Sequence, residues 1–327
     1  MSYIPLPQNV AGDAVLVEQK SGTSSTVDDG GGTLTVDDGG TSLTVDGEVT
    51  SNINVGGSPV TTLNPVPVAS TTTFDFFFEV SKGNVAGHSA LIRFARIPAT
   101  TGGSAQDDIA PFVLTYLTTA STIRIKAGGN AADTAAGTGA QSITVTGLDE
   151  NYLPVTDVIA TAGASASTAT TNTYLRVHSC YVTLVGSGEV NAAGITIEAV
   201  TGGTTQALIP AGEGQTEQMY NTIPAGKTGY IEEARISLID QEGGATVQHV
   251  GHFKGWIRIY NESSNNNYES WRDIFDSGLD TDGTNNATIP QRISDPLPEK
   301  TDIKMTVATH SANAEADARL FLILVDN

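Results

Sequence analysis

The carboxylates with the most regular spacing stand in a repeat near the N-terminus. The stretch "TVDDGGGTLTVDDGGTSLTVDGEV" repeats every nine residues, and Thr26, Thr35 and Thr44 open its three units. Carboxylates among glycines are typical of calcium-binding coils, whose nonapeptide reads Gly-Gly-x-Gly-x-Asp-x-apolar-x. Here the acidic pair precedes the glycines and the Gly-x-Asp spacing is missing, so calcium binding stays open as an alternative to a structural role. The carboxylates concerned are Asp28, Asp29, Asp37, Asp38 and Asp46.

Two other short motifs begin a chemical site without completing it. Residues 226–228 read Gly-Lys-Thr, as in a phosphate loop, but the glycine needed five positions before Gly226 is Asn221 and a strand is predicted to follow. His249 and His252 face opposite ways on a strand, and no carboxylate or cysteine completes a zinc set with them. No Gly-x-Ser-x-Gly elbow is present. We therefore expect no catalytic, cofactor-binding or metal-binding residues and no enzymatic activity.

One segment has the residue types of a recognition surface. "IYNESSNNNYESWRDIF" places Tyr260, Tyr268 and Trp271 around a polar loop rich in asparagine. Flat aromatic faces beside amide groups are used in sugar and protein recognition, although the same rings also pack in cores. These three residues are our candidate contacts for a receptor or partner.

Composition limits the partners of the chain. Its 327 residues carry 16 basic and 36 acidic side chains, a formal charge of −20, so no basic stripe for nucleic acid is visible. No stretch of eighteen or more apolar residues is present, which predicts no membrane insertion. The N-terminal "MSYIPLPQNV" lacks the features of a signal peptide. The single cysteine, Cys180, has apolar neighbours and is predicted to be a core residue.

Apolar alternation predicts an all-β fold. Short β-branched and aromatic runs are separated by Gly, Asn, Asp or Pro clusters, which is typical of antiparallel sandwiches, jelly rolls and barrels. Examples are "SITVTG", "YLRVHSCYVTLV", "GITIEAV", "GWIRIY" and "LFLILVDN". In "GWIRIY", Ile257 and Ile259 are expected on one face and Trp256, Arg258 and Tyr260 on the other.

Composition also divides the chain into three parts. Residues 1–70 hold the nonapeptide repeats and end in the proline-containing linker "LNPVPVAS", which predicts an extended N-terminal arm. The aromatic "FDFFFEV" then opens a first β domain, 71–200, and a second β-sandwich domain is predicted over 201–327. A single large double-sheet core is the alternative to two domains.

The repeats bury too little apolar surface to fold alone, since ordering the backbone costs more than a few Leu and Val residues return. We expect partners to order the arm, either sister chains wrapped around it or a host surface that it pairs with. Trimerisation would let three copies cover one another's apolar faces and open edges. The predicted anchoring contacts are Val27, Leu34, Val36, Leu43 and Val45.

Several long segments resemble a known group of proteins. "FFFEVSKGNVAGHSALIRFARIP", "DTAAGTGAQSITVTGLDENYLPVTDVI", "TYLRVHSCYVTLVGSGEVNAAGITI" and "IPAGEGQTEQMYNTIPAGKTGYI", with the ending "LFLILVDN", resemble β-rich virion structural proteins of tailed, largely marine bacteriophages. The repeats are similar to N-terminal arms of phage tail and fibre components. The resemblance covers roughly residues 74–327, and the arm matches more loosely.

This resemblance implies a virion structural protein, made in the host cytoplasm and assembled onto the particle. The expected role is an oligomeric fibre or spike on tail, neck or head, anchored by its arm and projecting β domains toward a host glycan or protein. The expected partners are further copies, as a homotrimer, and other capsid, neck or tail proteins. Two alternatives stay open: a capsid decoration protein that stabilises the shell, and a tail-associated glycan depolymerase that uses two of the thirty-six acidic residues.

Overall fold

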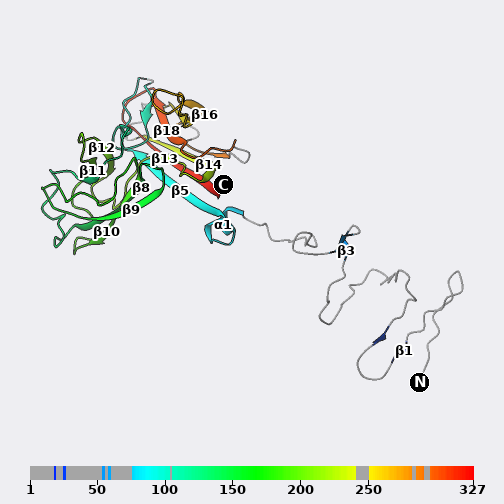
Figure 1. Cartoon of the computed structure of the whole chain (residues 1–327). Helices are drawn as coiled ribbons and strands as arrows, with labels where there is room; N and C mark the ends of the chain where they lie inside the picture. The colour runs from blue at the N-terminus through cyan, green and yellow to red at the C-terminus, as the bar shows by residue number, and fades with distance from the viewer. Residues whose placement is uncertain are drawn as a thin grey trace. The chain divides into compact units, whose positions relative to one another are not determined.

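The computed structural model describes residues 76–103, 105–240, 250–281, 285–290 and 295–327, together with four short strands nearer the N-terminus. These short strands form two antiparallel pairs, β1 with β2 and β3 with β4. They are β1 (Glu18–Gln19), β2 (Ser25–Thr26), β3 (Asn54–Val55) and β4 (Ser58–Pro59). The chain divides into two units, Met1–Thr73 and Phe74–Asn327, and the second unit contains the apolar cores (Figure 1).

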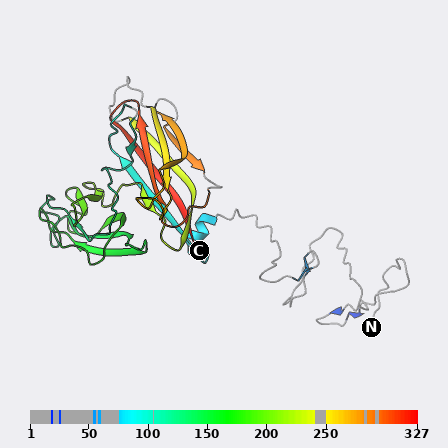
Figure 2. The same ribbon diagram turned by 45° about the horizontal axis from the view of Figure 1, so that its top comes forward.

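The regular secondary structure described in the second unit is almost all antiparallel strand, which confirms the all-β prediction. The one helix among the described residues is α1 (Phe76–Ser81). Two sheets pack face to face as a large sandwich, seen in Figure 2 with its strands running along the long axis of that body. One sheet has the order β17 (Asn286–Pro290), β14 (Lys227–Asp240), β19 (Ala314–Asp326), β5 (His88–Ile97). The other has the order β13 (Tyr220–Thr222), β18 (Asp302–Thr309), β15 (Val250–Arg258), β16 (Arg272–Asp280).

The chain moves between these two sheets in a regular order. β5 lies in the first sheet, β13 in the second, β14 in the first, β15 and β16 in the second, β17 in the first, β18 in the second and β19 in the first. Their inner faces share one apolar core, in which Phe253 and Leu322 are fully buried. The burial pattern of β15 alternates as predicted, with Ile257 inside and Trp256 and Arg258 outside this core.

A smaller β body is inserted into the chain of the large sandwich, between two short strands at one edge of the second sheet. The two-residue strand β6 (Asp107–Asp108) and β13 pair with the same strand, β18, and their registers follow one another. Asp108 lies opposite Thr306, and Tyr220 lies opposite Lys304. Between them, the N–H of residue 219 donates to the carbonyl of residue 109 at 3.1 Å. The ends of the insertion therefore meet, which is the arrangement that lets one domain be inserted into another.

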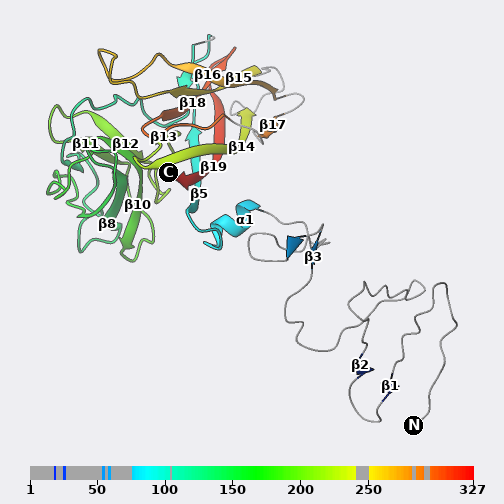
Figure 3. The ribbon, with the colours of Figure 1, turned by 45° about the vertical axis from the view of Figure 1, so that its right-hand side comes forward.

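The inserted body has its own sheets and its own core (Figure 3). Residues such as Ile143 and Ile197 are completely buried in it. One three-stranded sheet has the order β10 (Arg176–Val185), β8 (Ala140–Leu148), β9 (Pro154–Ala160). The other has the order β12 (Thr205–Ile209), β11 (Ile195–Ala199), β7 (Ile123–Ile125).

These sheets do not follow the division at residue 200 that composition predicts. β5, from the predicted first domain, pairs along ten residues with β19 at the C-terminal end of the chain. β12, from the predicted second domain, pairs with β11 of the inserted body. The larger sandwich is therefore discontinuous in sequence. Composition cannot reveal this, because a strand carries the same apolar alternation whichever sheet it joins.

No helix in the described part of the chain is long and apolar enough to cross a membrane.

Candidate binding site

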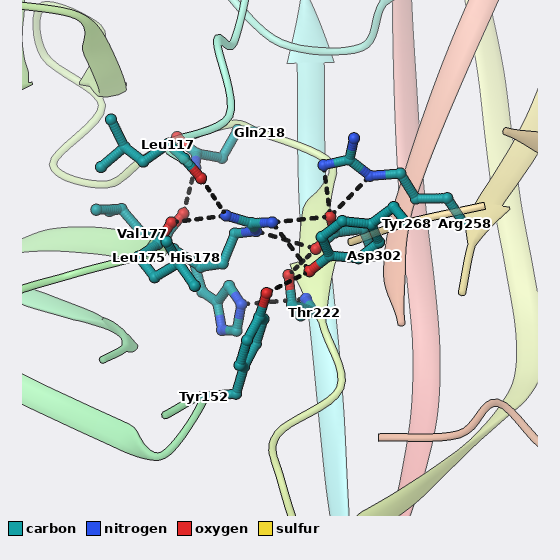
Figure 4. Close-up of polar contacts among 11 residues, drawn as sticks. Leu117, Tyr152, Leu175, Val177, His178, Gln218, Thr222, Arg258, Tyr268 and Asp302 are labelled. Atoms are coloured by element: carbon teal, nitrogen blue, oxygen red, sulfur yellow. Dashed lines mark hydrogen bonds and ion pairs between the residues drawn. The ribbon is translucent and has the colours of Figure 1, made fainter. Parts of the chain in front are cut away.

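A buried carboxylate joins the two bodies of the second unit. Asp302 opens β18 of the large sandwich and is completely buried. Arg176 is the first residue of β10 in the inserted body. It donates two hydrogen bonds to this carboxylate, from Nε to Oδ1 at 3.0 Å and from a terminal nitrogen to Oδ2 at 3.1 Å. Arg258, at the end of β15, donates to Oδ2 at 2.8 and 2.7 Å (Figure 4). The first residues of β18 and β10 and the last residue of β15 thus meet at the carboxylate of Asp302.

Further hydrogen bonds surround the Arg176–Asp302 ion pair. The Thr222 hydroxyl donates to Asp302 Oδ1 at 2.5 Å, and Arg176 donates to the Tyr268 hydroxyl oxygen at 3.0 Å. The hydroxyls of Tyr268 and Tyr152 lie 2.8 Å apart in a hydrogen bond. Arg176 also donates to the carbonyl oxygens of residues 117 and 175 at 3.0 and 2.9 Å. Such saturation is what a buried ion pair needs to recover its desolvation cost.

The charges in this cluster do not balance, since two guanidinium groups face one carboxylate. Burial by itself would lower the pKa of Arg176, but the attraction of Asp302 outweighs it and the pKa is raised. Burial also raises the pKa of the Tyr268 hydroxyl, so this group stays neutral. The joint therefore carries local positive charge in a chain whose formal charge is −20.

Aromatic rings enclose Arg258 on several sides. Its guanidinium carbon lies 4.2 Å from the ring centre of Tyr116, 4.3 Å from that of Tyr268 and 4.8 Å from that of Trp271. Cation–π contacts of this kind gain strength when the cation is shielded from water. The three rings thus hold the Arg258 guanidinium in place on the outer side of the ion cluster.

A cavity of about 520 Å³ opens beside the cluster. Four tyrosines line it, Tyr116, Tyr152, Tyr260 and Tyr268, together with both arginines. Residues 265–267, three consecutive asparagines on an exposed turn, form its polar side. An aromatic wall, amide groups and a fixed charged base are the usual elements of a ligand pocket.

The structure brings two of the three predicted aromatic residues to this cavity. Tyr260 is partly exposed, and its ring packs edge-on against Tyr152 and Tyr268. Tyr268 also lines the cavity but is only 6% exposed, and its hydroxyl is used inside the joint. Trp271 does not line the cavity: it packs on Arg258 and lies 5.9 Å from the ring of Tyr116. Tyr260 is thus the predicted residue best placed to meet a ligand.

The sequence around each residue does not predict the charged and aromatic cluster at the base of the cavity. Arg176 and Asp302 are 126 positions apart, and Tyr152 and Tyr268 are 116 apart. Each has an ordinary strand or loop neighbourhood. The one signal in the sequence is an arginine within the largely apolar, strand-like run "TYLRVHSCYV", since a charged residue buried there needs a partner.

The turn at Gly226 and the buried Cys180 agree with the sequence predictions, whereas only one histidine of the pair is described. Residues 225 and 226 form the turn between β13 and β14, and Gly226 has a φ of 73°, which favours glycine. His252 is exposed on β15, whereas His249 lies outside the described residues. Cys180 is 1% exposed in the inserted core, and burial raises the pKa of its thiol.

The predicted arm contacts lie outside the described residues. They are Val27, Leu34, Val36, Leu43 and Val45. The calcium alternative at Asp28, Asp29, Asp37, Asp38 and Asp46 also lies there. Within the described ranges no three His, Cys, Asp or Glu side chains gather closely enough to hold a metal ion.

A second charged cluster links the segment before β13 to the first sheet. Arg96 on β5 meets Glu315 at 2.8 Å, Glu213 at 3.4 Å and Glu217 at 4.0 Å. Glu217 is 4% exposed. Burial first, and then the charge of Glu213, raises its pKa to about 7, although Arg96 opposes the shift.

Glu217→Gln is expected to stabilise the protein above pH 7 and to have little effect below pH 5. A carboxyl whose pKa is raised on folding favours the folded state at low pH, and that contribution is lost as pH rises through the folded pKa, here about 7. The effect is on the order of 1–3 kcal/mol. Urea unfolding at pH 5 and pH 8.5 measures it, with the exposed Glu262→Gln as control. Equal pH dependence in wild type and Glu217→Gln would refute this account.

Comparisons with known proteins add little to this picture. No family model matches the chain, and no curated protein matches it. Among solved structures, the VP2 subviral particle of infectious bursal disease virus aligns over 73% of this chain and 72% of its own, with 10% identity and a TM-score of 0.13. The Gt strain of that virus aligns over 73% and 75%, with 11% identity and the same TM-score. At such a TM-score we base no inference on either alignment.

Proposed function

We propose that this protein is a structural component of a bacteriophage virion whose β domains bind a host glycan, with no catalytic step. The observation that carries the proposal is the cavity at the joint, where tyrosine rings and asparagine amides surround a fixed charged base. The resemblance of residues 74–327 to phage virion proteins gives the setting. In this view the protein acts through binding and shape.

The strand order of the large sandwich supports a virion role. We take as support two antiparallel sheets, β5-β19-β14-β17 and β13-β18-β15-β16 with the short β6 also on β18, between which the chain passes as it would in a jelly roll. Viral capsid domains and lectins both use this fold. Fold alone does not assign a function, so this support is by analogy.

The cavity supports glycan recognition more specifically. Tyr260 offers a partly exposed ring to stack on a sugar face, and Asn265 offers an exposed amide beside it. The ring position is fixed, because Lys300 lies 4.7 Å from its centre and Tyr268 packs against it. A preformed site loses little entropy on binding.

The N-terminal repeats fit an anchoring role in the same proposal. The arm would attach to other virion proteins by strand addition and burial of its Leu and Val positions. Three copies in a homotrimer would cover one another's apolar faces. The β domains would then project as a fibre or spike.

The jelly-roll strand order also supports a second candidate, a decoration protein that clamps capsid subunits. The two candidates differ in where the protein lies on the particle and in whether the cavity binds sugars.

Tyr260→Ala is expected to weaken glycan binding by about tenfold or more, because an aromatic stacking face is worth at least about 1.4 kcal/mol. The measurement is a glycan array with the full chain, followed by titration of the best glycan. Asn265→Ala should weaken binding less, since one exposed amide contributes less than a ring.

Tyr230→Ala is the matched control, because Tyr230 is 38% exposed on β14 and does not line the cavity. It should bind glycan as the wild type does. Wild-type protein that binds no glycan, or a Tyr260→Ala variant that binds as tightly as Tyr230→Ala, would contradict the proposed ligand.

A further inference from the structure

A second, smaller cavity lies between the large sandwich and the inserted body. Its volume is about 210 Å³, well above the roughly 10–15 Å³ that one water molecule needs. Its polar wall is formed by Arg93 of β5, His178 of β10 and Gln218 of the segment entering β13. This cavity shares no lining residue with the tyrosine-lined cavity, so a ligand here would be independent of the proposed glycan site.

Arg93 is a cation without a counter-ion. Its Nε donates to Asn221 Oδ1 at 3.2 Å, and no carboxylate of the described residues lies within ion-pair distance. By contrast, Arg96, Arg124 and Arg176 each pair with a carboxylate at 3.0 Å or less. Burial lowers the pKa of Arg93 to about 10, as expected for a cation that burial penalises and no anion stabilises.

His178 presents a second donor to the same cavity. The backbone N–H of Thr222 donates to its Nε2 at 3.1 Å, so the proton of the neutral ring lies on Nδ1. Burial, and then the charges of Arg93 and Arg176, lowers the pKa of this ring, which keeps it neutral. Its Nδ1–H has no partner among the described residues.

Asn221 lies beside Arg93, behind the cavity wall, and does not line the cavity itself. Because its Oδ1 accepts from Arg93, its Nδ2 must point the other way, and this buried nitrogen has no hydrogen-bond partner in the described part of the chain. Buried donors are nearly always satisfied in folded proteins. Arg93 and His178 thus bring a cationic and a neutral donor to the cavity wall, where Gln218 Oε1 is an acceptor without a partner among the described residues. A cation beside a second donor is complementary to an oxygen-bearing anion.

We propose that the cavity between β5 and β10 binds a small oxyanion, which Arg93 holds as a counter-ion and His178 orients through its Nδ1–H. The anion is a free phosphate or sulfate, or the carboxylate of a small organic acid. Exposed Ile92 and Tyr181 at the rim leave an apolar entrance beside the charged wall.

Titration calorimetry on the full chain tests the proposal, with sodium sulfate, inorganic phosphate and sodium acetate as separate probes and sodium chloride keeping ionic strength constant. At least one oxyanion should bind while chloride gives no signal. Binding of sulfate and phosphate alone identifies a tetrahedral ligand, and binding of acetate identifies a carboxylate. Absence of binding for all three overturns the proposal.

Two variants assign the bound anion to this cavity. Arg93→Gln should weaken binding at least tenfold. Arg93→Lys keeps the charge but loses the planar guanidinium with its several N–H donors, so it should weaken binding less. The matched control is Arg272→Gln, because Arg272 is 55% exposed on β16 and does not line the cavity. Equal binding by wild type, Arg93→Gln and Arg272→Gln overturns the assignment. Should Arg93→Gln fail to fold, the comparison of Arg93→Lys with Arg272→Lys decides in the same way.

Discussion

Asp302→Asn should lower the free energy of unfolding by about 3–5 kcal/mol, the cost of removing one partner from a buried ion pair. Asparagine has nearly the same shape, so the change removes the charge while leaving the volume. Arg176 would then stay buried with no carboxylate, and Arg258 would lose both of its strongest bonds. Urea unfolding at neutral pH, followed by tryptophan fluorescence, measures the loss.

The inserted body should also separate more easily from the large sandwich in this variant, because Arg176 is a buried polar link between that body and β18. Hydrogen exchange at the joint would rise in Asp302→Asn, while exchange inside β8 and β11 would change less.

Asp273→Asn serves as control, since Asp273 is 53% exposed and lies 3.5 Å from Lys254. An exposed pair of this kind contributes about 0–1 kcal/mol. Equal losses from Asp302→Asn and Asp273→Asn would show that the ion cluster does not hold the joint.

Phe253→Ala should destabilise the protein by about 3–5 kcal/mol, through lost apolar burial and the cavity left behind. Phe253 is fully buried on β15, near the middle of the sheet order, and belongs to the core shared by both sheets. A Cβ added at the neighbouring Gly251 would lie 3.1 Å from Leu238 Cδ2 and 3.5 Å from Phe253 Cε2, so the core around Phe253 is closely packed. Denaturant midpoints measure the change.

The matched control removes the same side chain from the surface. Phe78 of α1 is 57% exposed, and Phe78→Ala should change stability by about 0.5 kcal/mol or less. Similar losses from the two Phe→Ala variants would contradict a core centred between the two sheets of the large sandwich.

The sequence predicts the elements of this fold better than their connections. Alternation along "GWIRIY" and "LFLILVDN" identifies β15 and β19, because one face of each strand must meet the core. It does not tell that β5 joins β19 across more than two hundred residues. Nor does the alternation predict that Asp108 and Tyr220 lie in two short strands that pair, one after the other, with the same strand β18. Both facts depend on long-range pairing, for which a strand offers no local mark.

The candidate site shows the same division. The aromatic, asparagine-rich segment is local, and the sequence therefore predicts Tyr260 as a contact. The base of the cavity unites Arg176, Asp302 and Tyr152 from separate parts of the chain. Tyr268 and Trp271, predicted together with Tyr260, pack mainly on Arg258, because a buried guanidinium attracts aromatic faces.

The positive charges at the Asp302 joint and at Arg93 occur at the same boundary within the second unit. Both sites lie where the inserted body meets the large sandwich, in a chain with a formal charge of −20. An acidic surface favours solubility at high local concentration, as on an assembled particle. It also repels acidic ligands, so the anion site that we propose depends on the local charge of Arg93.

The most direct test of the virion proposal is immunogold electron microscopy, with antibody raised against residues 74–327 and applied to phage particles from an infected culture. We expect gold on fibres, spikes, neck or tail tip, in the position of a protein that projects β domains toward a host. Label spread evenly over the head would favour the decoration protein instead. Particles that carry no label, in a culture where the protein is detected, would contradict a place in the virion.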